Sequence, residues 1–172
     1  MPRVNAALTM RQWPPYGQGS YSAGMTLSDL SSPGSVLVPL EAETKEAAVA
    51  ALVGALALTA GAEELAAAVL AREAAGSTGI GRGVAIPHAR SATLKAPRLA
   101  AGLTAKPLDF AAADGRPVTL VFLLAVPEAD PKSHLKALAA LSRLAQDAKR
   151  LRALMRAPSP REFLAELSQV NL

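Results

Sequence analysis

A nearly unbroken apolar run from Pro117 to Val126 constrains the fold of this chain more than any other segment. A strand with one face in water alternates apolar and polar residues, whereas a strand covered on both faces is apolar along its length. Asp114-Gly115 precedes the run and is a turn signal. We therefore expect a central strand over Pro117 to Val126, with other elements packed on both of its faces.

Shorter apolar segments predict further strands, and periodic segments between them predict helices. Pro39 cannot donate to a central ladder, so the first of these strands is expected at a sheet edge. The expected strands are Ser35 to Leu40, Val84 to Ile86 and Leu99 to Ala105. The expected helices follow Thr44, span Glu63 to Glu73, start at Asp130-Pro131, run from Asp147 to before Pro158, and follow Ser159. Strands separated by helices indicate a layered α/β domain.

The composition suits one folded domain, which we expect over residues 25–172. The chain has 172 residues, of which 51% are hydrophobic, and it contains no cysteine. The absence of cysteine excludes disulfides, thiolate catalysis and cysteine-ligated zinc, and it fits a reducing cytoplasm, where we expect the protein. We interpret Met1 to Gly24 as a disordered tail, or as an over-extended start with Met25 as the true initiator.

Neither a membrane nor a nucleic acid is an expected partner. The longest apolar run, Ala47 to Ala62, is rich in alanine, is interrupted by glycine, and falls short of the roughly 20 apolar residues that a bilayer span needs. The net charge is +4, but the late basic residues interleave with leucines, as on the solvated faces of amphipathic helices. No aromatic stacking platform accompanies them.

The most distinctive polar residue is His88, one of only two histidines in the chain. It follows a glycine-rich segment, residues 76–83, and the short apolar segment that ends in Pro87. Pro87 fixes its own φ and biases Ile86 toward extended geometry, so His88 is expected on a rigid backbone. A neutral imidazole offers one nitrogen for nucleophilic attack while a hydrogen bond fixes the other. An ordinary core or surface histidine is the alternative.

The glycine-rich segment does not match a nucleotide-binding loop. Arg82-Gly83 stands where a P-loop has Lys-Ser/Thr, and the segment follows a helix rather than a strand. Two interpretations stay open, a flexible connection that uses positive-φ glycines and a loop that lets the backbone of a partner approach.

Arg72 and His134 are the candidate anion-binding residues. Arg72 follows Leu65 and Val69 at helical spacing, so we expect it to continue their buried stripe. Its guanidinium matches phosphate oxygens, although an arginine at a helix end can instead bind the last carbonyl groups. His134 lies in the first turn of a helix, on the face of Leu138 and Leu141, where it can donate to a phosphoryl group or be purely structural. Two histidines without cysteine or clustered carboxylates do not predict a metal site.

The sequence around His88 resembles a known phosphorylation-site pattern. Arg72-Glu73, Gly76-Ser77-Thr78-Gly79-Ile80-Gly81 and Ala85-Ile86-Pro87-His88 resemble the type-2 enzyme IIA domains of the bacterial phosphoenolpyruvate-dependent sugar phosphotransferase system (PTS). The wording is most similar to the nitrogen-regulatory branch, and the resemblance covers residues 25–172. Two positions depart from the commoner pattern, Ala89 in place of glycine and Arg82 in place of an acidic or small polar residue.

The resemblance implies a single-domain, three-layer α/β/α sandwich with a mixed sheet. It implies that His88 accepts a phosphoryl group from a histidine phosphocarrier protein, and that His134 and Arg72 stabilise this group. The group then passes to an enzyme IIB domain, with no cofactor, nucleotide or permanent metal. The alternative is a non-catalytic nitrogen or metabolic regulator whose binding to a target protein is switched by phosphorylation of His88. A degenerate domain that is never phosphorylated is a third possibility, which the presence of all three residues disfavours.

Overall fold

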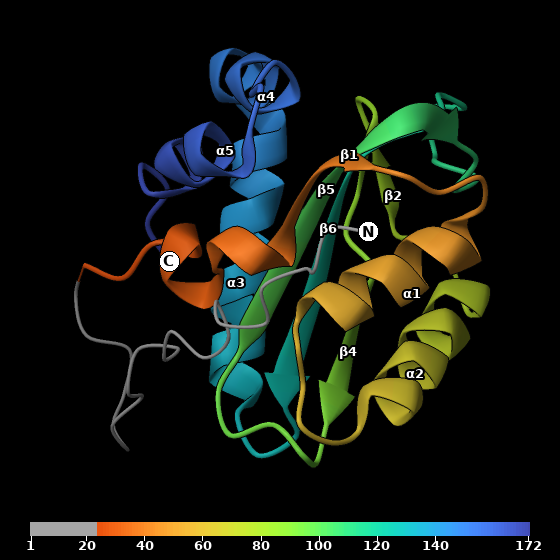
Figure 1. The fold of residues 1–172 in the computed structure, drawn as a ribbon, viewed down its shortest axis with the longest axis vertical. Helices are drawn as coiled ribbons and strands as arrows, with labels where there is room; N and C mark the ends of the chain where they lie inside the picture. Colours follow the sequence, from red (N-terminus) through yellow and green to blue (C-terminus); the bar gives the residue numbers. More distant parts are fainter. Residues whose placement is uncertain (1–23) are drawn as a thin grey trace, which may run out of the picture.

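A computed structural model of the chain describes residues 24–172, and Figure 1 shows that they form a sheet between two layers of helices. Residues 1–23 lie outside the described part, so the interpretation of Met1 to Gly24 as a tail or mis-assigned start is a proposal that rests on sequence alone. Within residues 24–172, no helix has the combination of length and hydropathy that crossing a membrane requires.

The sheet has six strands and is mixed, as expected. Its order is β1-β5-β6-β3-β2, with β4 also paired to β6. Strands β1 and β5, β3 and β6, and β4 and β6 pair in parallel, whereas β5 and β6 and β2 and β3 are antiparallel. The bounds are β1 Val36–Leu40, β2 Gly79–Gly81, β3 Val84–Ala85, β4 His88–Ser91, β5 Arg98–Leu108 and β6 Val118–Pro127.

Strand β6 is the central strand that its apolar run predicts. Every residue of β6 except Thr119 is buried. Successive side chains alternate between two cores, since Phe122 and Leu124 belong to one cluster and Val121 and Leu123 to the other. The apolar run therefore reflects burial on both faces. The expected edge position of the strand with Pro39 is also confirmed, because β1 ends the sheet order.

Helices cover both faces of the sheet (Figure 1). One face carries α1 Lys45–Ala55 and α2 Ala62–Ala74, and the other carries α3 Pro131–Gln146, α4 Ala148–Met155 and α5 Pro160–Leu167. Two short 3₁₀ turns, Leu27–Leu30 and Pro33–Ser35, precede β1. The layered α/β fold, with three layers and one domain, is confirmed.

Side-chain caps define the helix starts as predicted. Thr44 Oγ1 accepts from the Ala47 N–H at 3.1 Å and starts α1, and Asp130 Oδ1 accepts from the Ser133 N–H at 3.1 Å and starts α3. Asp147 caps α4 and Ser159 caps α5 in the same way. These caps satisfy backbone donors that the helix itself leaves without partners.

The segment before His88 is more ordered than either sequence interpretation proposed. Residues 79–85 form an antiparallel hairpin, β2 and β3, with the turn at Gly81, Arg82 and Gly83. The expected strand over Val84 to Ile86 ends at Ala85, and His88 begins β4 rather than following the end of a strand. Pro87 has no N–H to donate, so the ladder is interrupted there and resumes at His88.

The expected burial of Arg72 is wrong. Arg72 is exposed, and the buried residues of α2 are Leu65, Val69 and Glu73. Residues at i, i+4 and i+8 follow one inclined row on a helix, and this row leads from Leu65 to Glu73. Arg72 lies beside that row in the last turn, where its long side chain reaches solvent.

The basic residues of the last three helices lie on solvated faces, as expected, but one leucine departs from the pattern. Leu141 and Leu144 are buried in the core, whereas the side chain of Leu135 is 69% exposed. Leu135 is the residue after His134, so an unusually exposed apolar side chain adjoins one of the candidate site residues.

Candidate functional site

The two histidines meet where strand β4 lies beside the start of helix α3. His88 is aligned with Leu124 of β6 in a parallel pair, and α3 follows the end of β6 and returns along the same face of the sheet. This reversal brings the first turn of α3 back to the level of His88. The ring centroids of His88 and His134 are 5.4 Å apart, with the ring planes tilted by 58°.

The ring of His88 is held by one hydrogen bond to its own backbone segment. Its Nδ1 lies 2.7 Å from the carbonyl oxygen of Ile86. A carbonyl oxygen only accepts, so Nδ1 must carry the hydrogen, and in the neutral ring Nε2 then has the free lone pair. The backbone is also fixed, because Pro87 O accepts from the Leu124 N–H at 3.0 Å. His88 therefore presents an oriented nucleophilic nitrogen.

His134 is half-buried and its ring is not fully satisfied. Among residues 24–172, its buried Nε2 has no hydrogen-bond partner. Burial lowers the pKa of His134, and the nearby charges of His88 and Arg90 lower it further. His134 is therefore neutral at pH 7, and a neutral imidazole can donate one N–H to an anion without losing a proton.

Arg90 is a site residue that sequence reasoning missed. Within β4, His88 is half-buried, Ala89 and Ser91 are buried and Arg90 is exposed. Because side chains alternate along a strand, His88 and Arg90 project from the same face of β4. The effect of Arg90 on the pKa of His134 agrees with this placement. The sequence signal was that Arg90 stands two positions after His88. This spacing places both side chains on one face only if His88 lies in a strand.

Arg72 is not brought into hydrogen-bond contact with either histidine within the described residues. Its Nη1 donates to the carbonyl oxygen of Gly76 at 2.9 Å, just beyond the end of α2. This contact agrees with the alternative interpretation of Arg72, in which an arginine at a helix end binds the last carbonyl groups. Helix α2 also packs on the opposite face of the sheet from α3.

The hairpin and the last residues of helix α3 enclose a groove of about 270 Å³. Ile80, which is 46% exposed, and Arg82 line it on the hairpin side, and Ala145 lies on the side of α3. Arg82 Nη1 donates to the carbonyl oxygen of Gln146 at 2.9 Å, at the opposite end of α3 from His134. Arg82 therefore ties the hairpin to α3 and is not part of the histidine pair.

Hydrogen bonds also anchor the tip of the hairpin. The Arg82 N–H donates to Asp114 Oδ2 at 2.8 Å, and this bond is the main cause that lowers the pKa of the Asp114 carboxyl. Gly79 is required where the hairpin approaches the chain at Ala112, because an added Cβ would lie 2.8 Å from the Ala112 Cβ. The glycines thus serve close packing and a tight turn.

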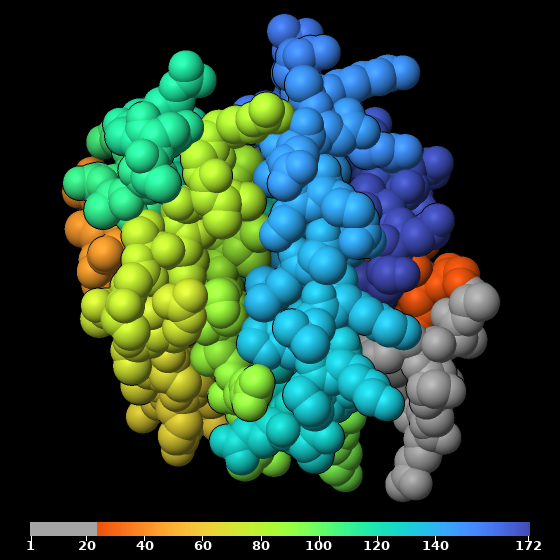
Figure 2. Space-filling view, turned by 180° about the vertical axis from the view of Figure 1, so that it is seen from behind, coloured from red at the N-terminus to blue at the C-terminus, as the bar shows by residue number. Residues whose placement is uncertain are grey.

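Figure 2 shows the molecular face on which β4 and the hairpin lie between α2 and α3. Among residues 24–172, the large hydrophobic residues that are exposed are Ile80 and Leu135, and both belong to the elements of this face. Ile80 lines the groove at the end of α3 and Leu135 lies near its start, so they are two separate apolar points rather than one contiguous patch.

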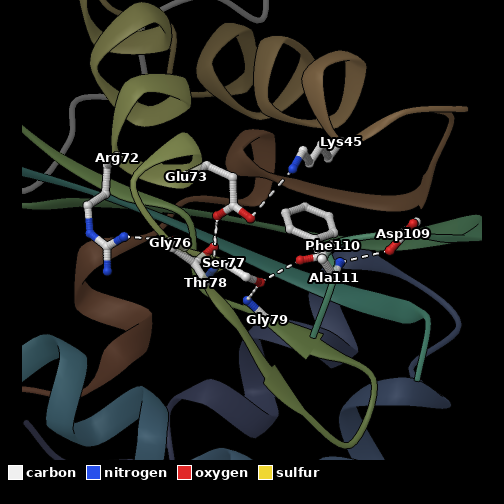
Figure 3. A network of polar contacts seen from close by, with 10 residues as sticks. All are labelled: Lys45, Arg72, Glu73, Gly76, Ser77, Thr78, Gly79, Asp109, Phe110 and Ala111. Atoms are coloured by element: carbon white, nitrogen blue, oxygen red, sulfur yellow. Dashed lines mark hydrogen bonds and ion pairs between the residues drawn. The ribbon is translucent and has the colours of Figure 1, made fainter. Parts of the chain in front are cut away.

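A second polar cluster lies on the other side of the hairpin, around Glu73 (Figure 3). Glu73 Oε2 accepts from both the N–H and the hydroxyl of Thr78, at 3.0 and 2.5 Å. Glu73 Oε1 lies 3.9 Å from the Lys45 ammonium. Ser77 donates to the carbonyl oxygen of Phe110 and accepts from the Gly79 N–H at 3.0 Å. In the sequence, Glu73 is distinguished only as the end of a predicted helix and as part of the motif that precedes His88.

Neither cluster offers the ligand set of a metal centre. In the described range, 24–172, no group of three or more histidine, cysteine, aspartate or glutamate side chains is placed to hold a metal ion.

Comparison with known proteins identifies the family of this chain. The family model "Phosphoenolpyruvate-dependent sugar phosphotransferase system, EIIA 2" matches residues 30–170. The chain belongs to this family. The expected family membership is thus confirmed, and with it a role as a phosphoryl carrier of the phosphotransferase system or as a regulator built on the same domain.

The relatives include both regulatory and sugar-specific proteins. The nitrogen regulatory protein of Bradyrhizobium diazoefficiens is 42% identical over 139 residues, which are 75% of this chain and 88% of that protein. The crystal structure of nitrogen regulatory protein IIA-Ntr from Neisseria meningitidis superposes with a TM-score of 0.72 and 32% identity, over 81% of this chain and 97% of that one. Mannitol enzyme IIA of Escherichia coli, solved in complex with phosphorylated enzyme IIB, shares the fold at a TM-score of 0.64 and 20% identity, over 80% of this chain and 96% of that one.

Proposed function

We propose that this EIIA domain carries a phosphoryl group on Nε2 of His88. One observation carries the proposal: Nδ1 of His88 donates to the carbonyl oxygen of Ile86 at 2.7 Å, which leaves Nε2 as the nucleophile on a fixed ring. Membership of the EIIA 2 family supports phosphoryl transfer as the chemistry.

The transfer is an in-line displacement at phosphorus. The Nε2 lone pair of His88 forms the new P–N bond while the P–N bond to the histidine of the donor breaks, and the donor nitrogen keeps that electron pair. The positive charge that develops on the His88 ring spreads to Nδ1–H, where the Ile86 carbonyl dipole stabilises it. No proton needs to leave His88 during the step.

His134 and Arg90 supply the groups that stabilise the transferring phosphoryl oxygens. A neutral His134 donates an N–H, and Arg90 adds a fixed positive charge from the same face of β4 as His88. Arg72 is the third candidate, since four of its five N–H groups are not engaged by the hydrogen bond to Gly76 O. The resemblance supports Arg72, whereas the geometry supports Arg90 more strongly.

The partners follow from the exposed apolar groups and from the relatives. Leu135, the residue after His134, is an exposed apolar contact point for a phosphorylated histidine phosphocarrier protein, and Ile80 is a second one toward the far end of α3. An enzyme IIB domain is the proposed acceptor, which the solved complex of mannitol enzyme IIA with phosphorylated enzyme IIB supports by analogy of fold.

The second candidate function is regulation of a target protein by the phosphorylation state of His88. It is favoured by relatives named nitrogen regulatory protein, at 42% identity in sequence and a TM-score of 0.72 in structure. A phosphoryl group adds close to two negative charges at the histidine pair, and the residue after His134 is the exposed Leu135. Desolvating this charge opposes binding of an apolar partner surface, so phosphorylation would release such a target.

The test is phosphorylation by the purified relay. The protein, its His88→Ala variant and an Arg152→Ala control are incubated with phosphoenolpyruvate, enzyme I and the histidine phosphocarrier protein, and intact mass is measured. We expect one acid-labile phosphoryl group on the wild type and the control and none on His88→Ala. An unlabelled wild type beside a fully phosphorylated donor would reject the proposal.

The same preparation separates the carrier from the regulator. Transfer of the label to purified enzyme IIB domains identifies a carrier. If the label stays on this protein when each enzyme IIB domain of the organism is added, and phosphorylation changes its binding to another protein, the protein is a regulator.

A further inference from the structure

The buried carboxylate of Glu73 has no part in the proposed transfer. Glu73 is 4% exposed and lies in the last turn of α2, on the opposite face of the sheet from His134. Burying an ionised carboxylate is costly unless several donors surround it. Oε2 of Glu73 accepts two hydrogen bonds from Thr78, whereas its buried Oε1 has no hydrogen-bond partner among residues 24–172 and lies 3.9 Å from the Lys45 ammonium. A carboxylate kept buried at this cost suggests a specific task.

A sequence of hydrogen bonds leads from Glu73 to the ring of His88. Glu73 Oε2 binds Thr78 at two donors, the N–H and the hydroxyl (Figure 3). The carbonyl oxygen of Thr78 accepts from the Ile86 N–H at 3.0 Å. The carbonyl oxygen of Ile86 accepts from His88 Nδ1 at 2.7 Å. Thr78 and Ile86 are thus the only two residues between the carboxylate and the imidazole along this path.

We propose that Glu73 is a positioning residue that keeps His88 in the Nδ1–H form by fixing the carbonyl group of Ile86. The proposal rests on the proposed role of His88 as the phosphoryl acceptor. Glu73 acts through Thr78 and Ile86 and does not contact the reacting atoms.

The linkage acts through position rather than through electronic polarisation. The N–H and the C=O of one residue belong to different peptide groups, so charge on Glu73 is not relayed along a conjugated path. Instead, two bonds to a charged acceptor hold Thr78 more firmly than neutral bonds would. Thr78 O then fixes Ile86, and Ile86 O selects which nitrogen of His88 carries the hydrogen.

Lys45 lies near the carboxylate oxygen that Thr78 does not bind. Its ammonium is 3.9 Å from Glu73 Oε1, and its side chain is 31% exposed. The cation offsets the buried charge while remaining partly hydrated, so it does not compete with Thr78 for Oε2.

The experiment measures the tautomer of His88 directly. The protein is labelled with ¹⁵N at histidine, and the ring nitrogen shifts of His88 are recorded at a pH where its ring is neutral. The variants are Glu73→Ala, the isosteric Glu73→Gln, and Glu64→Ala as a control that removes an exposed carboxylate from the same helix. No donor protein is present.

We expect the ratio of Nδ1–H to Nε2–H to fall by roughly threefold in Glu73→Ala and by about twofold in Glu73→Gln, since each weakens one set of hydrogen bonds. The ratio should not change in Glu64→Ala. An unchanged ratio in a folded Glu73 variant overturns the proposal, and Glu73→Gln preserves side-chain shape in case Glu73→Ala does not fold.

The outcome is distinguishable from failure of the proposed function. If the tautomer ratio falls but the wild type cannot be phosphorylated, the positioning role of Glu73 stands and the carrier function fails. If phosphorylation of His88 is confirmed and the ratio is unchanged, the carrier function stands and the role of Glu73 fails.

Discussion

The polar groups around the hairpin fall into two clusters of opposite character. Around Glu73, one carboxylate oxygen accepts two hydrogen bonds and the other lies near an ammonium. In the histidine pair, His88 makes one bond to its own segment, and the buried Nε2 of His134 has no partner among the described residues. Each cluster thus holds one buried atom without a hydrogen-bond partner among residues 24–172, but the two atoms face different surroundings. Glu73 Oε1 lies 3.9 Å from the Lys45 ammonium, whereas the ring of His134 adjoins that of His88, where a ligand can use its free capacity.

We infer different roles for the two clusters: the Glu73 cluster holds the backbone rigid, and the histidine pair carries out the reaction. A site that transfers a charged group needs donors that are aligned in advance but not already occupied. The chain places those donors at the start of α3 and on β4, and it places the buried carboxylate, with two donors on one oxygen, at the end of α2. We therefore expect changes at Glu73 to lower stability, and changes at the histidines to lower the rate of transfer.

The largest expected effect is on stability. Glu73→Ala leaves both donors of Thr78 without an acceptor, so the free energy of unfolding should fall by about 2 to 3 kcal/mol. Urea denaturation followed by circular dichroism measures the change. The control Glu64→Ala, at an exposed position of the same helix, should change it by less than about 0.5 kcal/mol. Equal losses in the two variants would show that the Glu73 cluster contributes no more than a surface charge.

The next expected effect is on rate. His134→Ala removes a donor from the transferring phosphoryl group, so the initial rate of transfer from the phosphocarrier should fall by about 10- to 100-fold. Quenched-flow mass spectrometry measures this rate, and thermal unfolding monitors the fold. A wild-type rate in the variant would mean that His134 has only a structural role.

A smaller rate effect should distinguish the two arginines. Arg90→Ala should slow transfer by about five- to tenfold, and Arg72→Ala should slow it less, because Arg90 shares a strand face with His88. Arg152→Ala, at an exposed site on α4, is the matched control for loss of one positive charge. The opposite order of the two effects would transfer the role to Arg72, as the family resemblance implies.

The smallest expected effect is a pH dependence of stability. Burial lowers the pKa of His134, so the unfolded chain takes up a proton at a higher pH than the folded chain does. The contribution of His134 to the free energy of unfolding is therefore fully present above the unfolded pKa of about 6.5, and it decreases as the pH falls below that value. Because water screens this partly exposed ring, the decrease should stay below about 1 kcal/mol. Urea titrations at pH 7.5 and 5.5 should show it in the wild type and not in His134→Gln; a decrease of equal size in both would assign it to other groups.

The sequence predicted the elements whose signals are local. The apolar run of β6 and the caps Thr44, Asp130 and Asp147 each determine their structure within a few residues. Strand β4 was missed because its residues His88 to Ser91 show no apolar alternation and pair with β6, whose partner residues lie 36 positions later in the chain. Without β4, nothing in the sequence aligned Arg90 with His88.

The candidate site was predicted in part, because some of its residues have a local sequence signal and others are defined only by contacts between distant segments. The two histidines came from a motif and a family resemblance, and the structure brings their rings to 5.4 Å. The sequence predicted that Arg72 is the buried residue at the end of α2, but the buried residue is Glu73. Both positions fit helical spacing after Leu65 and Val69, so the pattern does not distinguish them. Only tertiary contacts with Thr78 and Lys45 distinguish them.

The most direct test of the central claim is to identify the phosphorylated nitrogen. Long-range ¹H–¹⁵N correlation and ³¹P spectra of the phosphorylated protein should show phosphorus on Nε2 of His88, with the hydrogen retained on Nδ1. Phosphorus on Nδ1 of His88, on His134 or on a side chain other than histidine would contradict the account, because the hydrogen bond from His88 to Ile86 would then not define the nucleophile.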